Sequence, residues 1–214
     1  MISSRGEVIG IYTRSDYYSF AVPSNRLKAL LTQSGPLEPL AQWHQRDHIR
    51  AYAYHHEGEG RFNAGDYVKA IVSFDNAISQ NPKHIRAYFW RGRAKYGLGK
   101  SKADQGNITE AQQLYQVAIG DYTQAIQLFP KYPMAYNNRG WVKYLIGRIK
   151  AKQGNVGEAR RLYQAAIDDY THAININPQH VLAHYNRGNA KKALGQHEAA
   201  EKDFEKAKEL ESKK

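Results

Sequence analysis

Apolar side chains recur along most of the chain at intervals of three and four residues, the period of one face of an α-helix. Residues 111–126 show this pattern clearly; Gly106 and Asn107 interrupt it before the segment, and Pro130 ends it. The apolar positions of the segment are Ala111, Leu114, Tyr115, Ala118, Tyr122, Ala125 and Ile126. The pattern predicts two helices joined by a short turn, followed by a second turn marked by proline.

This helical unit is repeated. Residues 105–126 and 153–174 are identical at 15 of 22 positions and lie 48 residues apart. A proline and an Arg-Gly pair recur with the same period, at Pro82, Pro130 and Pro178, and at Arg91, Arg139 and Arg187. One hairpin cannot bury its apolar face alone, but stacked hairpins share a continuous core. We therefore predict an all-α solenoid of helical hairpins.

The units resemble the tetratricopeptide repeat (TPR), a helical hairpin of about 34 residues. In the first unit the small and aromatic markers are Gly58, Ala70, Phe74, Ala77 and Pro82. In the last unit they are Gly188, Gly195, Ala200, Phe204 and Ala207. The resemblance covers residues 51–210. It implies four repeats, at about 51–84, 85–132, 133–180 and 181–214, within an array that spans 49–214.

The period of 48 indicates that the two central repeats are longer than usual. Gly92 to Pro130 and Gly140 to Pro178 both span 38 residues, whereas a TPR has roughly 24 there, an excess of about 14. The position of Gly106 divides this excess equally, about seven residues to each helix. Seven residues are nearly two helical turns, about 10 Å, and rotate the helix face by only ~20°. We predict two elongated hairpins in the middle of the array.

The first fifty residues have a different pattern. Residues 8–11 and 18–22 read as strands, and residues 24–31 as the start of a helix. The segment 5–31 resembles the closing part of a trypsin-like serine protease barrel of the HtrA kind. The matching residues are Gly6, Val8, Ile9, Gly10 and Ile11, then Phe20, Ala21, Val22 and Pro23.

The nucleophile motif of that protease family, Gly-Asn-Ser-Gly-Gly, does not occur in this sequence. A Ser-His-Asp site needs all three groups together, and none of them can be assigned here. We therefore predict a β remnant without proteolytic activity over residues 1–32. Residues 33–48, with two prolines, are predicted to be a linker.

Composition adds limits on function. The chain has 214 residues, no cysteine and a net charge of +11, so disulfide, cysteine–zinc and thiol chemistry are excluded. A basic surface suits acidic partners, or solubility alone. No run of about 18 apolar residues and no signal-peptide layout is seen. The compartment is not fixed: the sequence as it stands is expected in the cytoplasm, and the cell envelope stays open if an upstream protease domain carries a signal.

Nine histidines raise the question of a metal site. His44 and His48 have a spacing that can place two imidazoles on one helix face, and His55 and His56 follow. The glutamate of the zinc-protease pattern is missing after His44, so we expect surface histidines. No Gly-rich phosphate-binding loop occurs either. We predict no metal, no cofactor and no catalytic residue.

The residues that recur at the repeat frame have structural and functional interpretations. Gly92, Gly140 and Gly188 are expected to permit close packing of helices. The arginines at 91, 139 and 187 could line a basic track, or they could satisfy carbonyl groups of a neighbouring helix. Both interpretations of the arginines stay open at this point.

The TPR resemblance implies that the first helix of each repeat lines a concave groove that binds an extended peptide. Amide and guanidinium groups there would pair with a peptide backbone or fork a carboxylate. The lysines of the known carboxylate clamp are not matched, because His55 stands at the corresponding place of repeat one. The groove positions are Arg86, Phe89, Trp90, Arg93, Asn137, Asn138, Trp141, Tyr185, Asn186 and Asn189.

Three hypotheses for function follow. The first is a non-enzymatic protein-interaction scaffold that binds an extended, acidic peptide in the groove. The second is the C-terminal targeting part of a serine protease with catalytic residues upstream of this sequence. The third and weakest is RNA binding, with base stacking on Trp90 or Trp141. The partner's identity and the oligomeric state are not determined by the sequence.

Overall fold

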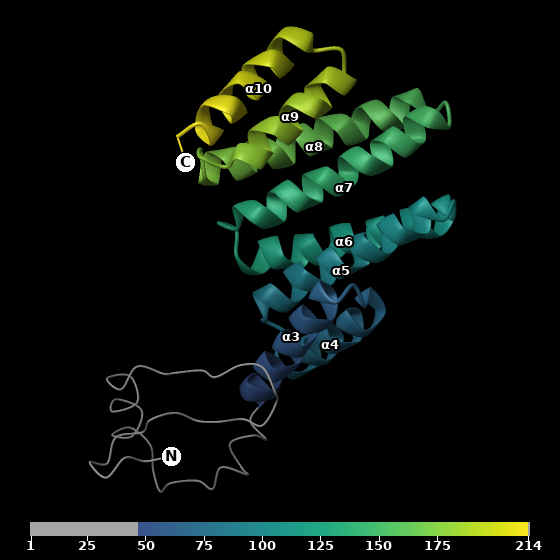
Figure 1. Cartoon of the computed structure of the whole chain (residues 1–214), viewed down its shortest axis with the longest axis vertical. Helices are drawn as coiled ribbons and strands as arrows, with labels where there is room; N and C mark the ends of the chain where they lie inside the picture. Colours follow the sequence, from purple (N-terminus) through teal and green to yellow (C-terminus); the bar gives the residue numbers. More distant parts are fainter. Residues whose placement is uncertain (1–46, 214) are drawn as a thin grey trace, which may run out of the picture. The chain divides into compact units, whose positions relative to one another are not determined.

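The computed structural model describes residues 47–213 (Figure 1). The chain divides into two units, Met1–Gln45 and Arg46–Lys214. The predicted β remnant at 1–32 and nearly all of the predicted linker at 33–48 lie outside the described residues. Within the described part, every regular element is a helix, and none of these helices is long and apolar enough to cross a membrane.

The described residues form four helical hairpins that follow one another along the chain. Each helix packs mainly against its hairpin partner, and the second helix of each hairpin also packs against the first helix of the next. The hairpins are α3 (Asp47–Asn63) with α4 (Tyr67–Gln80), α5 (Ile85–Asp104) with α6 (Ile108–Leu128), α7 (Pro133–Lys152) with α8 (Val156–Ile176), and α9 (Val181–Ala193) with α10 (His197–Glu211). The predicted all-α hairpin solenoid is confirmed.

The two central hairpins have long arms. Helices α5 and α7 have 20 residues each, and α6 and α8 have 21 each. In the last hairpin α9 has 13 and α10 has 15. The difference of six to seven residues per arm is the extension that the 48-residue period predicts. Figure 1 shows the turns of both long hairpins beyond the end of the α9–α10 hairpin.

Glycine ends the first arm of each long hairpin. Gly106 and Gly154 have φ angles of +84° and +79°, which favour glycine because side chains with a Cβ are strained there. The amide of Asn107 donates to the carbonyl of Lys102, and the amide of Gly106 donates to Ala103. This arrangement is a Schellman motif, and it explains why the chain reverses at the predicted place.

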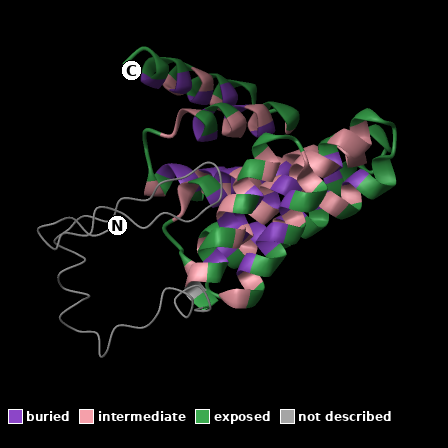
Figure 2. Ribbon diagram, turned by 60° about the horizontal axis from the view of Figure 1, so that its bottom comes forward, coloured by how far each residue is buried: buried purple, intermediate pink, exposed green. Residues whose placement is uncertain are grey.

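The frame glycines let the two helices of a hairpin approach each other. A Cβ on Gly92 would lie 2.9 Å from the Tyr122 ring, and one on Gly140 would lie 2.9 Å from the Tyr170 ring. Both tyrosines are almost fully buried. The inner helix faces are buried and the outer faces exposed (Figure 2). The predicted packing role of these glycines is therefore confirmed.

The frame arginines bind buried carboxylates, so neither sequence interpretation of them is correct. Arg139 Nη2 lies 2.6 Å from Asp169 Oδ1, and Lys143 Nζ lies 2.7 Å from Asp169 Oδ2. Asp169 is only 2% exposed. A buried carboxylate needs such partners because its desolvation is costly. The same three-residue cluster occurs as Arg91, Lys95 and Asp121, and as Arg187, Lys191 and Asp203.

The last cluster shows the electrostatic balance. Burial alone would raise the pKa of Asp203, but hydrogen bonds from Arg187 and Lys191 outweigh it and hold that pKa below its ordinary value. In the first hairpin Glu57 replaces the arginine, and its carboxylate binds Arg61 instead. The charge at this frame position is thus reversed in repeat one.

Candidate functional site

A broad hollow among the described residues lies over the first helices of the central hairpins. We call it the α5–α7 groove; it encloses about 1290 Å³. Helices α5 and α7 form most of it, the end of α3 and the start of α4 form one side, and the start of α9 closes one end. Its residues are Glu59, Phe62, Tyr67, Ile85, Arg86, Phe89, Trp90, Arg93, Tyr96, Gly97, Lys100, Ser101, Asp104, Gln105, Tyr122, Phe129, Tyr132, Met134, Asn137, Asn138, Trp141, Val142, His180 and Leu182.

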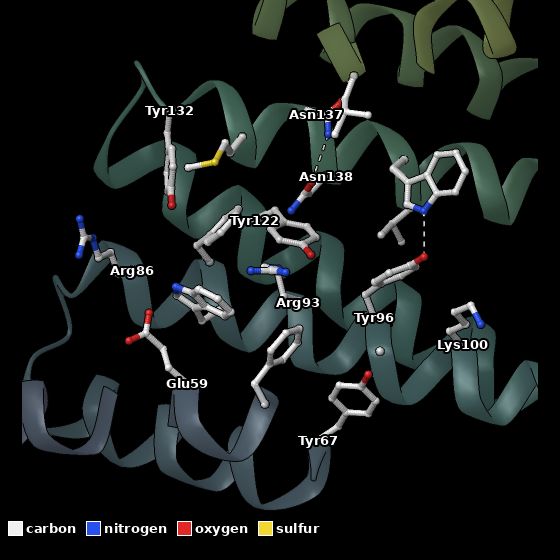
Figure 3. A pocket seen from close by; sticks show the side chains of 18 of the residues that line it. Glu59, Tyr67, Arg86, Arg93, Tyr96, Lys100, Tyr122, Tyr132, Asn137 and Asn138 are labelled. Atoms are coloured by element: carbon white, nitrogen blue, oxygen red, sulfur yellow. Dashed lines mark hydrogen bonds between the residues drawn. The ribbon is translucent and has the colours of Figure 1, made fainter. Parts of the chain in front are cut away.

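Arg93 lies at the centre of the groove (Figure 3). Its guanidinium carbon is 4.2 Å from the centre of the Trp90 ring and 4.7 Å from that of Phe62. Within residues 47–213 no carboxylate forms an ion pair with Arg93. The two rings hold the guanidinium by cation–π attraction, while its N–H groups keep their capacity to bind an anion.

Two further cations lie on the same helix face. Arg86, Arg93 and Lys100 are spaced by seven residues along α5, so they lie in one row about 10 Å apart. Figure 3 shows Arg86 and Lys100 toward opposite ends of the groove. Arg86 is exposed and forms no ion pair with any residue that the structure describes. Lys100 pairs with Asp104 at 2.9 Å on an exposed surface, where such a pair is weak.

The groove also contains one carboxylate from α3. Glu59 faces the groove in Figure 3. Its Oε2 atom lies 3.1 Å from Nδ1 of His56, and its Oε1 atom lies 3.5 Å from Nε2 of His55. The groove is therefore basic along α5 and has one acidic group at the α3 side.

An aromatic pair joins the two long hairpins beneath the groove. The indole Nε1–H of Trp141 on α7 donates to the hydroxyl of Tyr96 on α5 at 3.0 Å. Tyr96 also stacks on Tyr115, with ring centres 5.9 Å apart. This contact fixes the spacing of α5 and α7 and gives the groove a rigid, amphipathic floor.

Amide side chains connect α7 to α9. Asn186 Nδ2 donates to Asn137 Oδ1 at 3.1 Å, and Asn137 Nδ2 donates to Asn138 Oδ1 at 3.2 Å. Asn137 is buried, as expected for an amide whose hydrogen-bonding groups are used within the protein. Asn138 is half-buried and remains at the groove surface.

Of the ten positions predicted to line a groove, seven meet in the α5–α7 groove. They are Arg86, Phe89, Trp90, Arg93, Asn137, Asn138 and Trp141. The other three, on α9, are not among its lining residues. Asn186 turns to Asn137, and Tyr185 packs on Phe204 with ring centres 5.5 Å apart. Only the start of α9 reaches the groove, through His180 and Leu182, so Tyr185, Asn186 and Asn189 lie too far along the helix.

Sequence reasoning missed several groove residues. Tyr96 and Lys100 continue the stripe of Arg86 and Arg93 along α5, and the seven-residue spacing could have revealed Lys100. Tyr67 belongs to a second helix of a hairpin, α4, and reaches the groove because Gly97 leaves room for its ring; a Cβ on Gly97 would lie 2.8 Å from that ring. The approach depends on tertiary packing, for which the sequence gives no signal.

The expectation of surface histidines is wrong for three of them, because His55, His84 and His184 are buried. The His55 side chain is 1% exposed, and the ring centres of His55 and His84 are 4.8 Å apart. Burial, followed by the charges of His84, His56 and Arg86, lowers the pKa of His55 to about 3. No group of three or more histidine or carboxylate side chains within residues 47–213 is arranged to hold a metal ion.

Comparisons with known proteins identify this architecture. The stacked hairpins define a helical-repeat solenoid, and family models described as "Tetratricopeptide repeat" match residues 86–131, 142–172 and 181–214. The chain belongs to the tetratricopeptide repeat family. Proteins with this fold are generally non-catalytic scaffolds for protein–protein interaction. Among curated proteins, none matches the chain.

Solved structures share the fold. A crystal structure of MamA is 24% identical with a TM-score of 0.59, covering 81% of this chain and 85% of that one. TTC0263, a thermophilic TPR protein from Thermus thermophilus, is 20% identical with a TM-score of 0.59, covering 76% and 75%. The first TPR of Spaghetti (RPAP3), bound to the HSP90 peptide SRMEEVD, is 20% identical with a TM-score of 0.54, covering 69% and 95%. At these identities the likeness concerns the fold alone.

Proposed function

We propose that this protein is an interaction scaffold that binds an extended, acidic peptide in the α5–α7 groove. The observation that carries the proposal is the pair of guanidinium groups, Arg86 and Arg93, on one face of α5 without carboxylate partners among the described residues. A guanidinium can fork a carboxylate with two parallel hydrogen bonds. The aromatic rings around Arg93 reduce the entropy that it loses on binding.

The spacing of the cations suits an extended ligand. Arg86, Arg93 and Lys100 lie about 10 Å apart, and an extended polyproline II chain rises about 3.1 Å per residue, with side chains three residues apart on the same side. Carboxylates three residues apart in a peptide would therefore meet successive cations. Asn138, at the groove surface, can pair with the peptide backbone. A peptide with acidic residues, SRMEEVD, is bound by the TPR of RPAP3, which supports this class of ligand without fixing its sequence.

The RNA hypothesis is less well supported. Trp90 has the Arg93 guanidinium over its ring and Phe62 against its edge, with ring centres 5.2 Å apart. Trp141 packs on Tyr144 and donates its indole N–H to Tyr96. Both rings are engaged within the protein, so base stacking would have to displace existing contacts. The serine protease hypothesis rests on residues 5–31, outside the described residues, and it stays a sequence-based prediction.

A binding titration tests the proposal. Fluorescence anisotropy would compare a labelled peptide that has glutamate at every third position with a matched peptide that has glutamine there. We expect the acidic peptide alone to bind, and Arg93→Gln to weaken it about tenfold, the loss of roughly one charged hydrogen bond. Lys202→Gln, which removes an equal charge from exposed α10, is the matched control. Equal binding of both peptides, or equal effects of the two substitutions, would refute the proposal.

A further inference from the structure

The tips of the two long hairpins have the same backbone and different charge. Residues 100–113 and 148–161 correspond position by position, 48 residues apart. The first tip has two cations and two carboxylates, a net charge of zero; the second has five cations and one carboxylate, a net charge of +4. The difference arises at three positions, where Lys152, Arg160 and Arg161 replace Asp104, Gln112 and Gln113. More than a third of the chain's net charge of +11 is therefore concentrated in this second tip.

The charges of the second tip lie close together in space. Lys150 Nζ on α7 contacts Glu158 Oε2 on α8 at 3.0 Å, which fixes the antiparallel alignment of the two arms. In that alignment Arg148 lies level with Arg160, and both are within about two helical turns of the hairpin end. The first tip has the equivalent pair, Lys102 with Glu110 at 3.1 Å. The arms are thus aligned equally in both hairpins, and only the charge differs.

Four cations of the second tip are available for a partner. Arg148, Lys152, Arg160 and Arg161 are exposed, and no carboxylate in the described part of the chain forms an ion pair with them. Val156, the first residue of α8, is 59% exposed at the turn between them. An apolar side chain surrounded by cations is suited to the boundary between lipid headgroups and acyl chains.

We propose that the tip of the α7–α8 hairpin docks on an anionic lipid surface. The tip lies beyond the α9–α10 hairpin (Figure 1), so it can reach a flat surface without obstruction by that hairpin. A negative leaflet attracts clustered lysine and arginine side chains, and the attraction is additive along such a cluster. Residues 148–161 contain no aromatic side chain, so the tip lacks the stacking platform of single-strand nucleic-acid sites. This site is separate from the α5–α7 groove and does not depend on its proposed function.

Vesicle flotation with the full chain tests this proposal. The probes are vesicles of phosphatidylcholine with about 30 mol% phosphatidylserine, and vesicles of phosphatidylcholine alone. We expect binding only to the anionic vesicles and a decrease in binding as salt is raised. The triple variant K152D/R160Q/R161Q gives the second tip the residues of the first; we expect its vesicle affinity to fall about a hundredfold, since each lost cation contributes roughly fivefold.

A matched control separates the tip from total charge. The variant K202D/K206Q/K208Q on α10 lowers the net charge by the same four units and should still float with anionic vesicles. Circular dichroism confirms that each variant is folded. The reciprocal variant D104K/Q112R/Q113R adds a second basic tip and should strengthen binding. Equal vesicle binding by wild type and the tip variant, or no vesicle binding by wild type together with tip-dependent binding of a single-stranded RNA probe, would overturn the proposal.

Discussion

His55 and His84 lie against each other in the first repeat, with ring centres 4.8 Å apart, and the His55 side chain is only 1% exposed. Neither ring nitrogen of His55 has a hydrogen-bond partner among the described residues. Burial is the main cause that lowers the pKa of both rings, to about 3 for His55. Both histidines are therefore mainly neutral in the folded protein at pH 7.

The first prediction is a loss of stability in acid. The folded pKa of His55, about 3, is below its unfolded value of 6.5, so the unfolded chain binds more protons and stability falls as pH decreases from about 6.5 toward 3. Between pH 6.5 and 5 we expect His55 to contribute a decrease of about 2 kcal/mol in the free energy of unfolding. Urea titrations at these two pH values measure it.

The variant His55→Phe should reduce this acid sensitivity. Phenylalanine stands at the equivalent position of repeat two, Phe89, where it is buried. The exposed His197 provides a control, and His197→Gln should leave the pH dependence unchanged. An unaltered acid decrease in His55→Phe would show that another group is responsible.

The second prediction concerns the buried ion cluster of the third repeat. Asp169→Asn removes the charge that faces both Arg139 and Lys143 and leaves two cations without their carboxylate. Removal of one partner from a buried cluster is strongly destabilising, and we expect a loss of about 3 kcal/mol in thermal or urea unfolding. The neighbouring Asp168 is exposed and bonds only to Gln164, at 3.1 Å, among the described residues. Asp168→Asn should change stability by no more than about 0.5 kcal/mol, and equal effects of the two substitutions would contradict the assignment.

The third prediction tests the equal extension of both arms. Deletion of residues 147–153 together with 157–163 removes the last six residues of α7 with its capping residue Gln153, and seven residues of α8. It restores the spacing of a repeat of ordinary length. Because Gly147 packs directly on the Tyr163 ring, the double deletion removes both partners of this contact. We expect a folded protein with a cooperative thermal transition and less helix by circular dichroism.

Deletion of one arm alone should behave differently. Loss of residues 147–153 only would leave Leu162 and Tyr163 on α8 without the helix that covers them. We expect a broad transition at lower temperature and binding of a hydrophobic dye. A single-arm deletion as stable as the double deletion would show that the two arms are not matched.

The sequence could predict the hairpins, their lengths and their turns because these depend on local patterns. The turn glycines Gly106 and Gly154, the frame prolines and the helical spacing of apolar residues each act within one repeat. The same register places seven of the ten predicted positions among the residues that line the α5–α7 groove. Whether Tyr185, Asn186 and Asn189 line the groove depends on how successive hairpins stack, and the repeat spacing does not specify that stacking.

Buried charge was the least predictable feature. Arg139 and Asp169 are 30 residues apart in a long repeat, whereas Arg187 and Asp203 are 16 apart in the last one. The difference of 14 residues equals the seven residues added to each of the two arms. The equivalence of the two Arg–Asp pairs is therefore apparent only after the repeats are aligned. His55 is buried although histidine is usually a partly exposed residue, because its position belongs to the inner face of α3.

Arg139 also reaches outside its own repeat. Its Nη1 group donates to the hydroxyl of Thr123 on α6 at 3.1 Å, and Arg187 makes the same bond to Thr171 on α8 at 3.2 Å. Each arginine thereby links the buried ion cluster of its own hairpin to the second helix of the preceding hairpin. If one hairpin unfolded, its neighbour would lose this hydrogen bond as well. The loss raises the free-energy cost of an interface between folded and unfolded repeats. The array should therefore unfold in large cooperative units, with few partly unfolded molecules populated.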